Sequence, residues 1–313
     1  MRTGALVVCW GELLWDLFPD GPRLGGAAAN VAFHLARLGE RPLLVSRVGG
    51  DALGRRALAT LTDAGVDVSG VQLDPDAPTG TARVRLEDGQ PRFELGDSAA
   101  WDRLALTERV RDALEGPAEA LVFGTLAQRT ALGGAALHAA ARAATGKHRV
   151  VDLNLRPPHD SFGVARASLE LATAVKLNEH ELARVGAGAG APDAIAWLEG
   201  METLRHVAVT RGAAGASLSS RGVGGEWGRS AAPGVPAAAP PGEEADPVGA
   251  GDAWTAVFVH WLVRGGELEQ LPARANAYAG AVAARRGAMP ALEPLVVAAA
   301  RLGEPARAGR ASA

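Results

Sequence analysis

The chain has 313 residues, 48% of them hydrophobic and 21% charged, so it can bury a substantial core in one large or two modest domains. The net charge of -3 argues against nucleic acid as a partner, and the single cysteine, Cys9, excludes an internal disulfide framework. No signal peptide and no apolar stretch of about 20 residues can be recognised, so we expect no membrane partner and a cytoplasmic location.

Short apolar runs alternate with longer helical patterns along the chain, which is typical of parallel strands joined by crossover helices. The expected strands are residues 5–10, 43–48, 120–123, 149–153, 174–177 and 206–210. The expected helices are residues 28–38, 53–64, 107–114, 131–144, 193–201 and 255–263. This order predicts an α/β fold with a doubly wound, mostly parallel sheet flanked by helices.

One segment breaks this rhythm, because residues 81–86 and 92–95 alternate like strands and are joined by a turn. Together with residues 11–24, we expect them to form a small β lid over the carboxyl ends of the main strands. We therefore predict a single domain over residues 1–313, with a lid formed by segments at about 11–24 and 79–104. The Pro- and Ala-rich residues 231–242 are interpreted as a linker or surface loop.

The segment DPVGAGDAW, residues 246–254, carries most of the chemistry. Gly249 and Gly251 allow a tight turn, and the helix that follows begins with N–H groups that have no intrahelical partner. Together with Ala250, they form a site that can stabilise a phosphoryl group in transfer. Asp252 in the first turn can accept the proton of an attacking hydroxyl. Taken alone, Gly-x-Gly-Asp is as often a simple turn with an aspartate N-cap.

Residues 246–252 resemble the C-terminal signature of the ribokinase-like carbohydrate kinase family, D-[TP]-x-G-A-G-D. The N-terminal signature is matched by GGAAANVA, residues 25–32, with Ala28 where the usual form has Pro. Both signatures occur in the expected order, and the resemblance covers roughly residues 5–290. It implies a sugar kinase that uses ATP, with Asp252 as the general base and Gly249, Ala250 and Gly251 as the anion hole.

The same resemblance implies where the sugar binds. Asp16 is similar to the family's substrate-binding aspartate, and Gly25, Gly26 and Asn30 match further substrate contacts. An Asn amide offers both a donor and an acceptor to a diol. Without the family match, Asp16 would be a solvated turn carboxylate and Asn30 a helix N-cap.

Residues 152–156, DLNLR, match the family's D-x-N-x-R string after a strand. Because alternate side chains of an extended segment share a face, we expect Asp152, Asn154 and Arg156 to point together into the cleft. By resemblance, Arg156 contacts the transferred phosphate or the substrate.

The resemblance also implies nucleotide and metal contacts. The nucleotide contacts would be Asn178, Thr210, Gly212, Gly215, Gly249, Gly251 and Asn276. Asn178 and Glu181, in an N-x-x-E motif, would hold Mg²⁺ through waters, as suits an ion that keeps several waters. Many family members bind a monovalent cation near the anion hole, so K⁺ would lie at Asp246 and the carbonyls of Val248 and Gly287.

The return strand of the lid, with Phe93 and Glu94, and the A-W-D triplet at residues 100–102 resemble bacterial fructokinases. Kinases of 2-keto-3-deoxygluconate carry an Arg there, which reaches the substrate carboxylate. We therefore expect fructose, converted to fructose 6-phosphate, with Phe93 as a contact. Arg83 is a second expected contact and keeps the acid substrate as an alternative. The resemblance leaves another sugar or nucleoside kinase of the same family as a further alternative. Packing under the lid explains Phe93 and Trp101 at least as well as stacking on a sugar.

Other classes of protein fit less well. A nicotinamide enzyme needs G-x-G-x-x-G directly after the first strand, which Gly25 and Gly26 do not supply. A P-loop is missing around residues 146–148. A non-catalytic sugar or nucleotide sensor would be expected to lack the base Asp252. A homodimer through the exposed edge of the lid is a further hypothesis.

Overall fold

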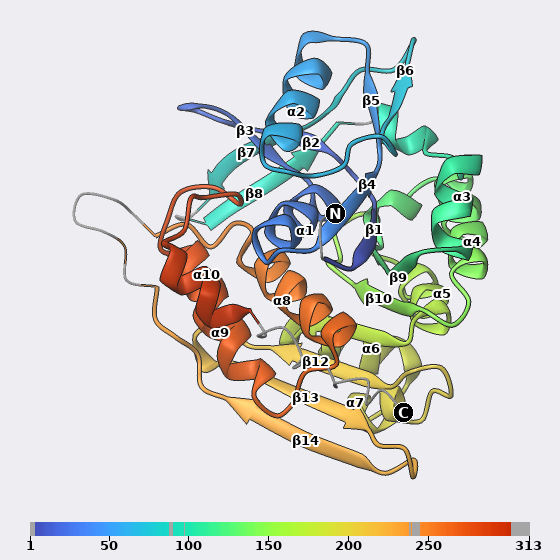
Figure 1. Ribbon diagram of the computed structural model, residues 1–313, viewed down its shortest axis with the longest axis vertical. Helices are drawn as coiled ribbons and strands as arrows, with labels where there is room; N and C mark the ends of the chain where they lie inside the picture. Colours follow the sequence, from blue (N-terminus) through green and yellow to red (C-terminus); the bar gives the residue numbers. More distant parts are fainter. Residues whose placement is uncertain (1–3, 88–89, 97, 238, 240–244, 302–313) are drawn as a thin grey trace, which may run out of the picture.

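The computed structural model describes residues 4–87, 90–96, 98–237, 239 and 245–301, and an eight-stranded sheet forms its centre (Figure 1). The strand order is β14-β13-β12-β11-β10-β9-β1-β4. The strands are β1 (Leu6–Trp10), β4 (Arg41–Val45), β9 (Ala118–Gly124), β10 (His148–Asp152), β11 (Ala174–Asn178), β12 (His206–Thr210), β13 (Ala216–Arg221) and β14 (Trp227–Ala232). Pairing is parallel from β4 to β12, and β13 and β14 add an antiparallel edge. The predicted α/β fold with a mostly parallel sheet is confirmed.

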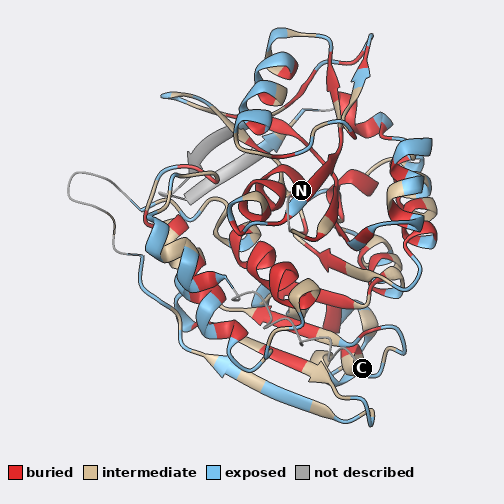
Figure 2. Cartoon of the chain, in the orientation of Figure 1, coloured by how far each residue is buried: buried red, intermediate tan, exposed pale blue. Residues whose placement is uncertain are grey.

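Helices cover both faces of this sheet, and the buried residues lie between the layers (Figure 2). One face carries α1 (Ala27–Arg37), α2 (Ala52–Asp63), α8 (Ala250–Arg264), α9 (Leu271–Ala283) and α10 (Pro294–Ala300). The other carries α3 (Glu108–Glu115), α4 (Ala131–Ala143), α5 (Phe162–Leu171), α6 (Glu179–Ala189) and α7 (Ala194–Glu199). On β1, Val7 and Cys9 join the first core and Val8 and Trp10 the second, as expected for a strand covered on both sides.

A separate four-stranded sheet has the order β3-β2-β7-β8, and we call it the lid sheet. Its strands are β2 (Leu14–Phe18), β3 (Gly21–Gly25), β7 (Gly80–Glu87) and β8 (Gln90–Leu95). β2 pairs in parallel with β7, and the outer pairs are antiparallel. Segments about 60 positions apart in the chain thus build one sheet.

Some boundaries differ from the sequence prediction. The predicted strand 43–48 is two strands, because β4 ends at Val45 and β5 (Arg47–Gly49) leaves the main sheet to pair with β6 (Gln72–Asp74). Ala231 and Ala232 belong to β14 and not to a loop. The sequence did not indicate this strand, because it lies half-exposed at the sheet edge and shows little hydrophobic alternation. The helices α5, α9 and α10 were not predicted, and the Ala-rich α9 has a weak hydrophobic period.

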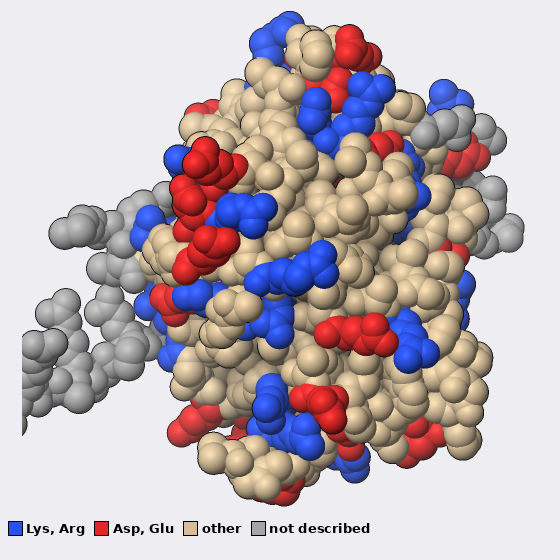
Figure 3. Space-filling view, turned by 90° about the vertical axis from the view of Figure 1, so that its right-hand side faces the viewer, with Lys and Arg blue, Asp and Glu red and all other residues tan. Residues whose placement is uncertain are grey.

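The surface mixes both signs of charge. The face drawn in Figure 3 carries Lys and Arg beside Asp and Glu side chains. In the described ranges, none of the helices combines the length and hydropathy needed to cross a membrane.

Candidate active site

The segment 246–252 forms a tight turn that leads into α8. Gly249 has φ 81°, and a Cβ there would lie 2.5 Å from Cα of Ala288, so only glycine fits without a shift. The helix begins at Ala250, whose N–H donates to the Pro247 carbonyl at 3.3 Å. Asp252 follows in the first turn, next to the positive end of the helix dipole.

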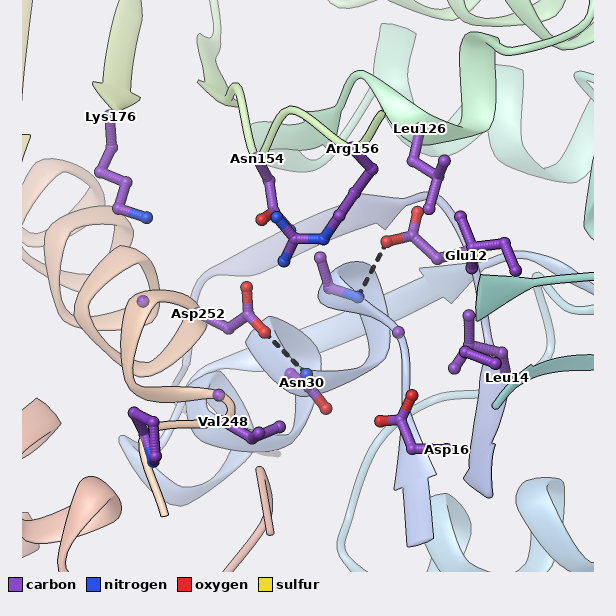
Figure 4. Close-up of a pocket in the computed structure, with 17 residues that line it drawn as sticks. Glu12, Leu14, Asp16, Asn30, Leu126, Asn154, Arg156, Lys176, Val248 and Asp252 are labelled. Atoms are coloured by element: carbon purple, nitrogen blue, oxygen red, sulfur yellow. Dashed lines mark hydrogen bonds between the residues drawn. The ribbon is translucent and has the colours of Figure 1, made fainter. Parts of the chain in front are cut away.

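Asp252 faces a cavity of about 270 Å³, which we call the first cavity (Figure 4). The lid sheet, the start of α1, the segments after β9 and β10 and the turn before α8 form its walls. The lining residues are Glu12, Leu14, Asp16, Gly26, Ala27, Asn30, Ala82, Leu95, Leu126, Asn154, Arg156, Lys176, Pro247, Val248, Gly249, Gly251 and Asp252.

The Asp252 carboxylate is held by Asn30, whose Nδ2 donates to Oδ2 at 2.7 Å (Figure 4). Burial and the charge of Asp152 raise the pKa of Asp252 to about 7, although the Asn30 hydrogen bond and the cations Lys176 and Arg156 lower it. A carboxyl that ionises near neutral pH is well matched to the task of a general base.

Asp16 on β2 lies in the same cavity. Burial and the charge of Asp252 raise the pKa of Asp16 to about 7, whereas Arg156 lowers it. Glycine is required at positions 25 and 26 for different reasons. A Cβ on Gly25 would overlap the Asp16 carboxylate, and Gly26 has a φ of 102°, which side chains rarely adopt. The predicted residues of the N-terminal signature and of the turn before α8 therefore lie in or beside one cavity.

Two further cavity residues were missed by the sequence interpretation. Glu12 Oε1 accepts the N–H of Ala27 at 3.0 Å and so caps α1, whose N-cap residue Gly26 has no side chain (Figure 4). This cap comes from 15 positions away, where local capping patterns do not find it. Lys176 could have been noticed as a cation inside the apolar strand β11, because lysine is rarely buried without a partner.

Lys176 is a buried cation beside the start of α8. Its side chain is 7% exposed, and Nζ lies 3.1 Å from each carboxylate oxygen of Asp152. Burial disfavours its charge, but Asp152, Glu181 and Asp252 outweigh this and raise the pKa of Lys176. A Cβ on Gly251 would lie 3.1 Å from Nζ, so the ammonium lies against the predicted anion hole.

The expectation that Asp152, Asn154 and Arg156 share one face is wrong. β10 ends at Asp152, and Asn154 has φ 41°, so the segment is not extended. Asp152 is buried behind the cavity, where it pairs with Lys176 and accepts the Thr255 hydroxyl at 2.7 Å. Asn154 and Arg156 do line the first cavity.

A second cavity of about 290 Å³ lies on the other side of the turn. It shares Pro247 and Gly251 with the first cavity, and its walls are mainly apolar. Its lining residues are Thr210, Gly212, Ala213, Gly215, Gly234, Val235, Pro236, Ala237, Pro247, Ala250, Gly251, Trp254, Asn276, Ala279, Gly280 and Ala283.

Asn276 uses its amide to build the wall of this second cavity. Nδ2 donates to the carbonyls of Ala232 and Pro233 at 3.1 and 2.9 Å, and Oδ1 accepts from Trp254 Nε1 at 3.0 Å. These bonds hold the end of β14 against α8 and α9. Asn276 thus lines the second cavity with its hydrogen bonds made to the protein, and its role with a nucleotide stays a prediction.

Asn178 and Glu181 form a reciprocal capping box at the start of α6. Asn178 Oδ1 accepts the Glu181 N–H at 2.9 Å, and Glu181 Oε2 accepts the Asn178 N–H at 2.8 Å. Glu181 Oε1 accepts the Leu155 N–H at 2.8 Å, and burial raises the pKa of Glu181. Their predicted role with Mg²⁺ stays a prediction.

The structure does not bring all predicted residues to the cavities. Arg83 on β7 is exposed and follows Ala82, which lines the first cavity, so the two side chains lie on opposite faces of the strand. The side chain of Phe93 lies outside the described residues. Trp101 is buried, with the Arg129 guanidinium 4.1 Å from its ring centroid, which supports the packing interpretation.

The predicted cation ligands lie together beside the turn. Asp246 Oδ1 accepts the Val248 N–H at 3.1 Å, and Oδ2 accepts the Gly287 N–H at 2.9 Å. The carboxylate therefore ties the turn before α8 to the loop around Gly287.

Known proteins resemble this chain in sequence and in fold. Residues 21–294 match the pfkB family of carbohydrate kinases. A fructokinase of Klebsiella pneumoniae is 33% identical over 303 residues, which cover 90% of this chain and 94% of that protein. The Vibrio cholerae O395 fructokinase, solved in a fructose-, ADP- and calcium-bound form, has a TM-score of 0.73 and 26% identity over 92% of this chain and 95% of that one. The Xylella fastidiosa fructokinase with bound ATP shares the fold, with a TM-score of 0.78 at 24% identity over 94% and 97% of the two chains. With this match over most of its length, the chain belongs to the pfkB family of carbohydrate kinases.

Proposed function

We propose that this protein transfers the terminal phosphoryl group of ATP to a hydroxyl of a neutral sugar, with fructose as the first candidate and fructose 6-phosphate as its product. The observation that carries the proposal is the position of Asp252. Its turn lies between a cavity that carries charged and amide side chains and a mainly apolar cavity, and both reach Gly251. A sugar in the first cavity and a nucleotide in the second would meet at this turn.

The polar groups of the first cavity suit a molecule rich in hydroxyls. Asn30 Oδ1 is buried and, among the described residues, has no hydrogen-bond partner, so it offers a ready acceptor. The Asp16 carboxylate adds further acceptor sites. A polyol that donates to both would satisfy groups that are otherwise costly to bury.

The transfer step follows from the same geometry. Asp252 takes the proton of the sugar hydroxyl while that oxygen forms a bond to the terminal phosphorus, and the bond from this phosphorus to the ADP oxygen breaks. The N–H groups at the start of α8 and the Lys176 ammonium stabilise the charge on the transferred group. Arg156, which lines the cavity, adds a second cation.

The charges near Lys176 leave a role for a divalent cation that the phosphates bring with them, since the described residues hold no cluster of three ligands that could bind a metal by itself. The charges of Asp152, Glu181 and Asp252 all raise the pKa of Lys176, and burial raises the pKa of both Glu181 and Asp252. This excess of carboxylates favours an additional cation. Mg²⁺ bound to the phosphates would supply that charge, and Asn178 and Glu181 would hold it through waters.

The second cavity is the proposed nucleotide site. Thr210, Gly212 and Gly215 line it, and Gly212 and Gly215 have φ of 52° and 95°, which brings bare backbone close to a ligand. Asn276 shapes the wall by its bonds to the protein.

The choice of fructose is supported by the fructokinases among the relatives. 2-keto-3-deoxygluconate is the alternative, and its carboxylate would need a cation. Arg83 is exposed, so Arg156 in the first cavity is the residue that would serve this acid.

A coupled assay of ADP release with fructose, 2-keto-3-deoxygluconate, ribose and adenosine tests the proposal, and the product is identified by NMR. We expect the highest kcat/KM with fructose, and Asp252→Asn should lower kcat by about 10²–10⁴-fold because the base is lost. Calorimetry that shows the Asp252→Asn variant still binds nucleotide is the control that this variant is folded. If the wild-type protein binds ligands but releases no ADP with any compound of the panel, a non-catalytic sensor is favoured.

The domain organisation and assembly are proposals too. We propose one domain whose lid sheet closes over the first cavity, and a homodimer through the edge of that sheet. Light scattering that returns the mass of a monomer would reject the dimer.

A further inference from the structure

Arg23 on β3 of the lid sheet reaches across to the turn before α8. Its Nη1 lies 3.4 Å from Asp246 Oδ2, and its Nη2 lies 2.6 Å from Asp20 Oδ2. The guanidinium carbon is 4.0 Å from the centroid of the Phe18 ring. The side chain is 25% exposed, so ion pairs and a ring face together fix its position.

The carboxylate that Arg23 contacts holds the turn together. Asp246 accepts N–H bonds from Val248 and Gly287, one on each oxygen. Gly249 packs against Ala288, which follows Gly287 in the chain. The anion hole therefore contacts the same loop that Asp246 binds through Gly287. A positive charge at Asp246 therefore stabilises the segment that would face the transferred phosphoryl group.

A bound monovalent cation would compete with this arginine. A cation at Asp246 and the carbonyls of Val248 and Gly287 would share the Asp246 carboxylate with the Arg23 guanidinium, whose Nη1 lies 3.4 Å from Oδ2. A Cβ on Gly287 would be 3.7 Å from Arg23 Cδ, so the arginine stem crosses over that loop. Two cations at one carboxylate repel each other. The guanidinium has the advantage because it is part of the chain, whereas a free ion loses translational freedom when it binds.

We propose that Arg23 supplies the positive charge at Asp246 in place of a monovalent cation, so that a residue of the lid sheet positions the anion hole. Phosphoryl transfer is then independent of K⁺. Arg23 is a positioning residue, because it acts through Asp246 and the turn.

The chain offers a matched control for Arg23. Arg286 Nη1 lies 3.4 Å from the same Asp20 oxygen, but its side chain is 58% exposed and no bond to Asp246 is found for it among the described residues. Arg286→Met therefore removes a guanidinium from the same cluster and leaves Asp246 paired.

The kinetic test rests on the proposed function and compares KCl with choline chloride at equal ionic strength. Wild-type kcat should agree within about twofold in the two salts. Arg23→Met should lower kcat by at least about tenfold in choline chloride, as expected for a displaced anion hole. KCl should restore part of that loss, and Arg23→Lys and Arg286→Met should stay close to wild type.

A second readout does not depend on turnover. The thermal midpoint of Arg23→Met should rise when KCl replaces choline chloride, whereas that of wild type and Arg286→Met should not. Strong stimulation of wild type by K⁺, a raised wild-type midpoint in KCl, or equal behaviour of Arg23→Met and Arg286→Met would overturn the inference. If no sugar is phosphorylated, the proposed function fails, but the thermal comparison still decides the role of Arg23.

Discussion

The side-chain amide of Asn30 donates a 2.7 Å hydrogen bond to the Asp252 carboxylate, although 222 positions separate the two residues. Asn30 belongs to α1 and Asp252 to the first turn of α8, and these two helices pack against each other. The bond fixes one oxygen of the proposed base and leaves the other toward the first cavity (Figure 4).

Asn30→Ala should shift the acid limb of the pH profile. Asp252 must be ionised to accept a proton, so kcat/KM falls as the pH drops through its pKa of about 7. The Asn30 bond lowers that pKa, so its loss should move the limb to higher pH and reduce activity more at pH 6 than at pH 8.5. The pH dependence of kcat/KM measures this. Asp16→Asn is the comparison: it should lower activity but keep a limb, because Asp252 remains. A limb that moves to lower pH in Asn30→Ala would contradict the assignment.

Lys176→Met should impair both chemistry and stability. It leaves Asp152 buried without its cation, which costs about 3–5 kcal/mol when one partner of a buried pair is removed. It also removes a charge that lowers the pKa of Asp252, so the remaining activity should need a higher pH. Lys147, the other lysine of the chain, is partly exposed and donates to the Gly116 carbonyl. Lys147→Met should change neither the denaturant midpoint nor kcat, and equal effects of the two substitutions would refute a role for Lys176.

Gly249→Ala should reduce kcat by about 10²-fold, because the turn must move to relieve a contact with Ala288 and the amides of the anion hole move with it. Gly265, at the other end of α8, also has positive φ, but a Cβ there meets nothing within 4 Å. Gly265→Ala should therefore cost about 1–2 kcal/mol of stability and leave kcat unchanged. Thermal unfolding and steady-state kinetics on both variants separate strain from loss of the anion hole.

Glu40→Gln should destabilise the fold by about 3–5 kcal/mol, since Glu40 is fully buried and bonds His260, Arg264 and the Ala5 N–H. Burial opposes its charge, but the bonds from His260 and Arg264 outweigh this and lower the pKa of Glu40. A lowered pKa stabilises the native state above the unfolded value of about 4.3, and this stabilisation is lost as the pH falls further.

The difference between wild type and Glu40→Gln in free energy of unfolding should thus be constant from pH 8 to about pH 5 and shrink below that. Urea titrations over this range measure it. Glu269→Gln, at an exposed position, is the control and should stay close to wild type. A difference that grows toward acid pH would show that the sign is wrong.

The central strands could be predicted from the sequence because both of their faces are covered and their apolar runs are unbroken. β12 begins and ends where it was predicted, β1 and β11 differ by one residue at one end, and β9 is longer by one or two residues at each end. β14 was missed because it buries little and has no clear alternation. The turn before α8 was predictable because its glycines and aspartate are adjacent in the chain.

The rest of the site depends on contacts between distant residues. The Arg23–Asp246 pair spans 223 positions, and the Lys176–Asp152 pair joins neighbouring strands. No local pattern contains such pairs. Asn276 illustrates the limit: it lines the second cavity, but its bonds to Ala232 and Pro233 depend on how β14 meets α9.

Within the part of the chain that the structure describes, Pro247 and Gly251 are the only residues that line both cavities. Under the proposed function, a substitution that reshapes the sugar side leaves the nucleotide side intact, and the reverse holds as well. Evolution can therefore exchange the acceptor without redesigning the donor site, and an engineer who wants a different sugar can vary Leu14, Ala82, Leu95 and Leu126 while the phosphoryl-transfer apparatus stays as it is.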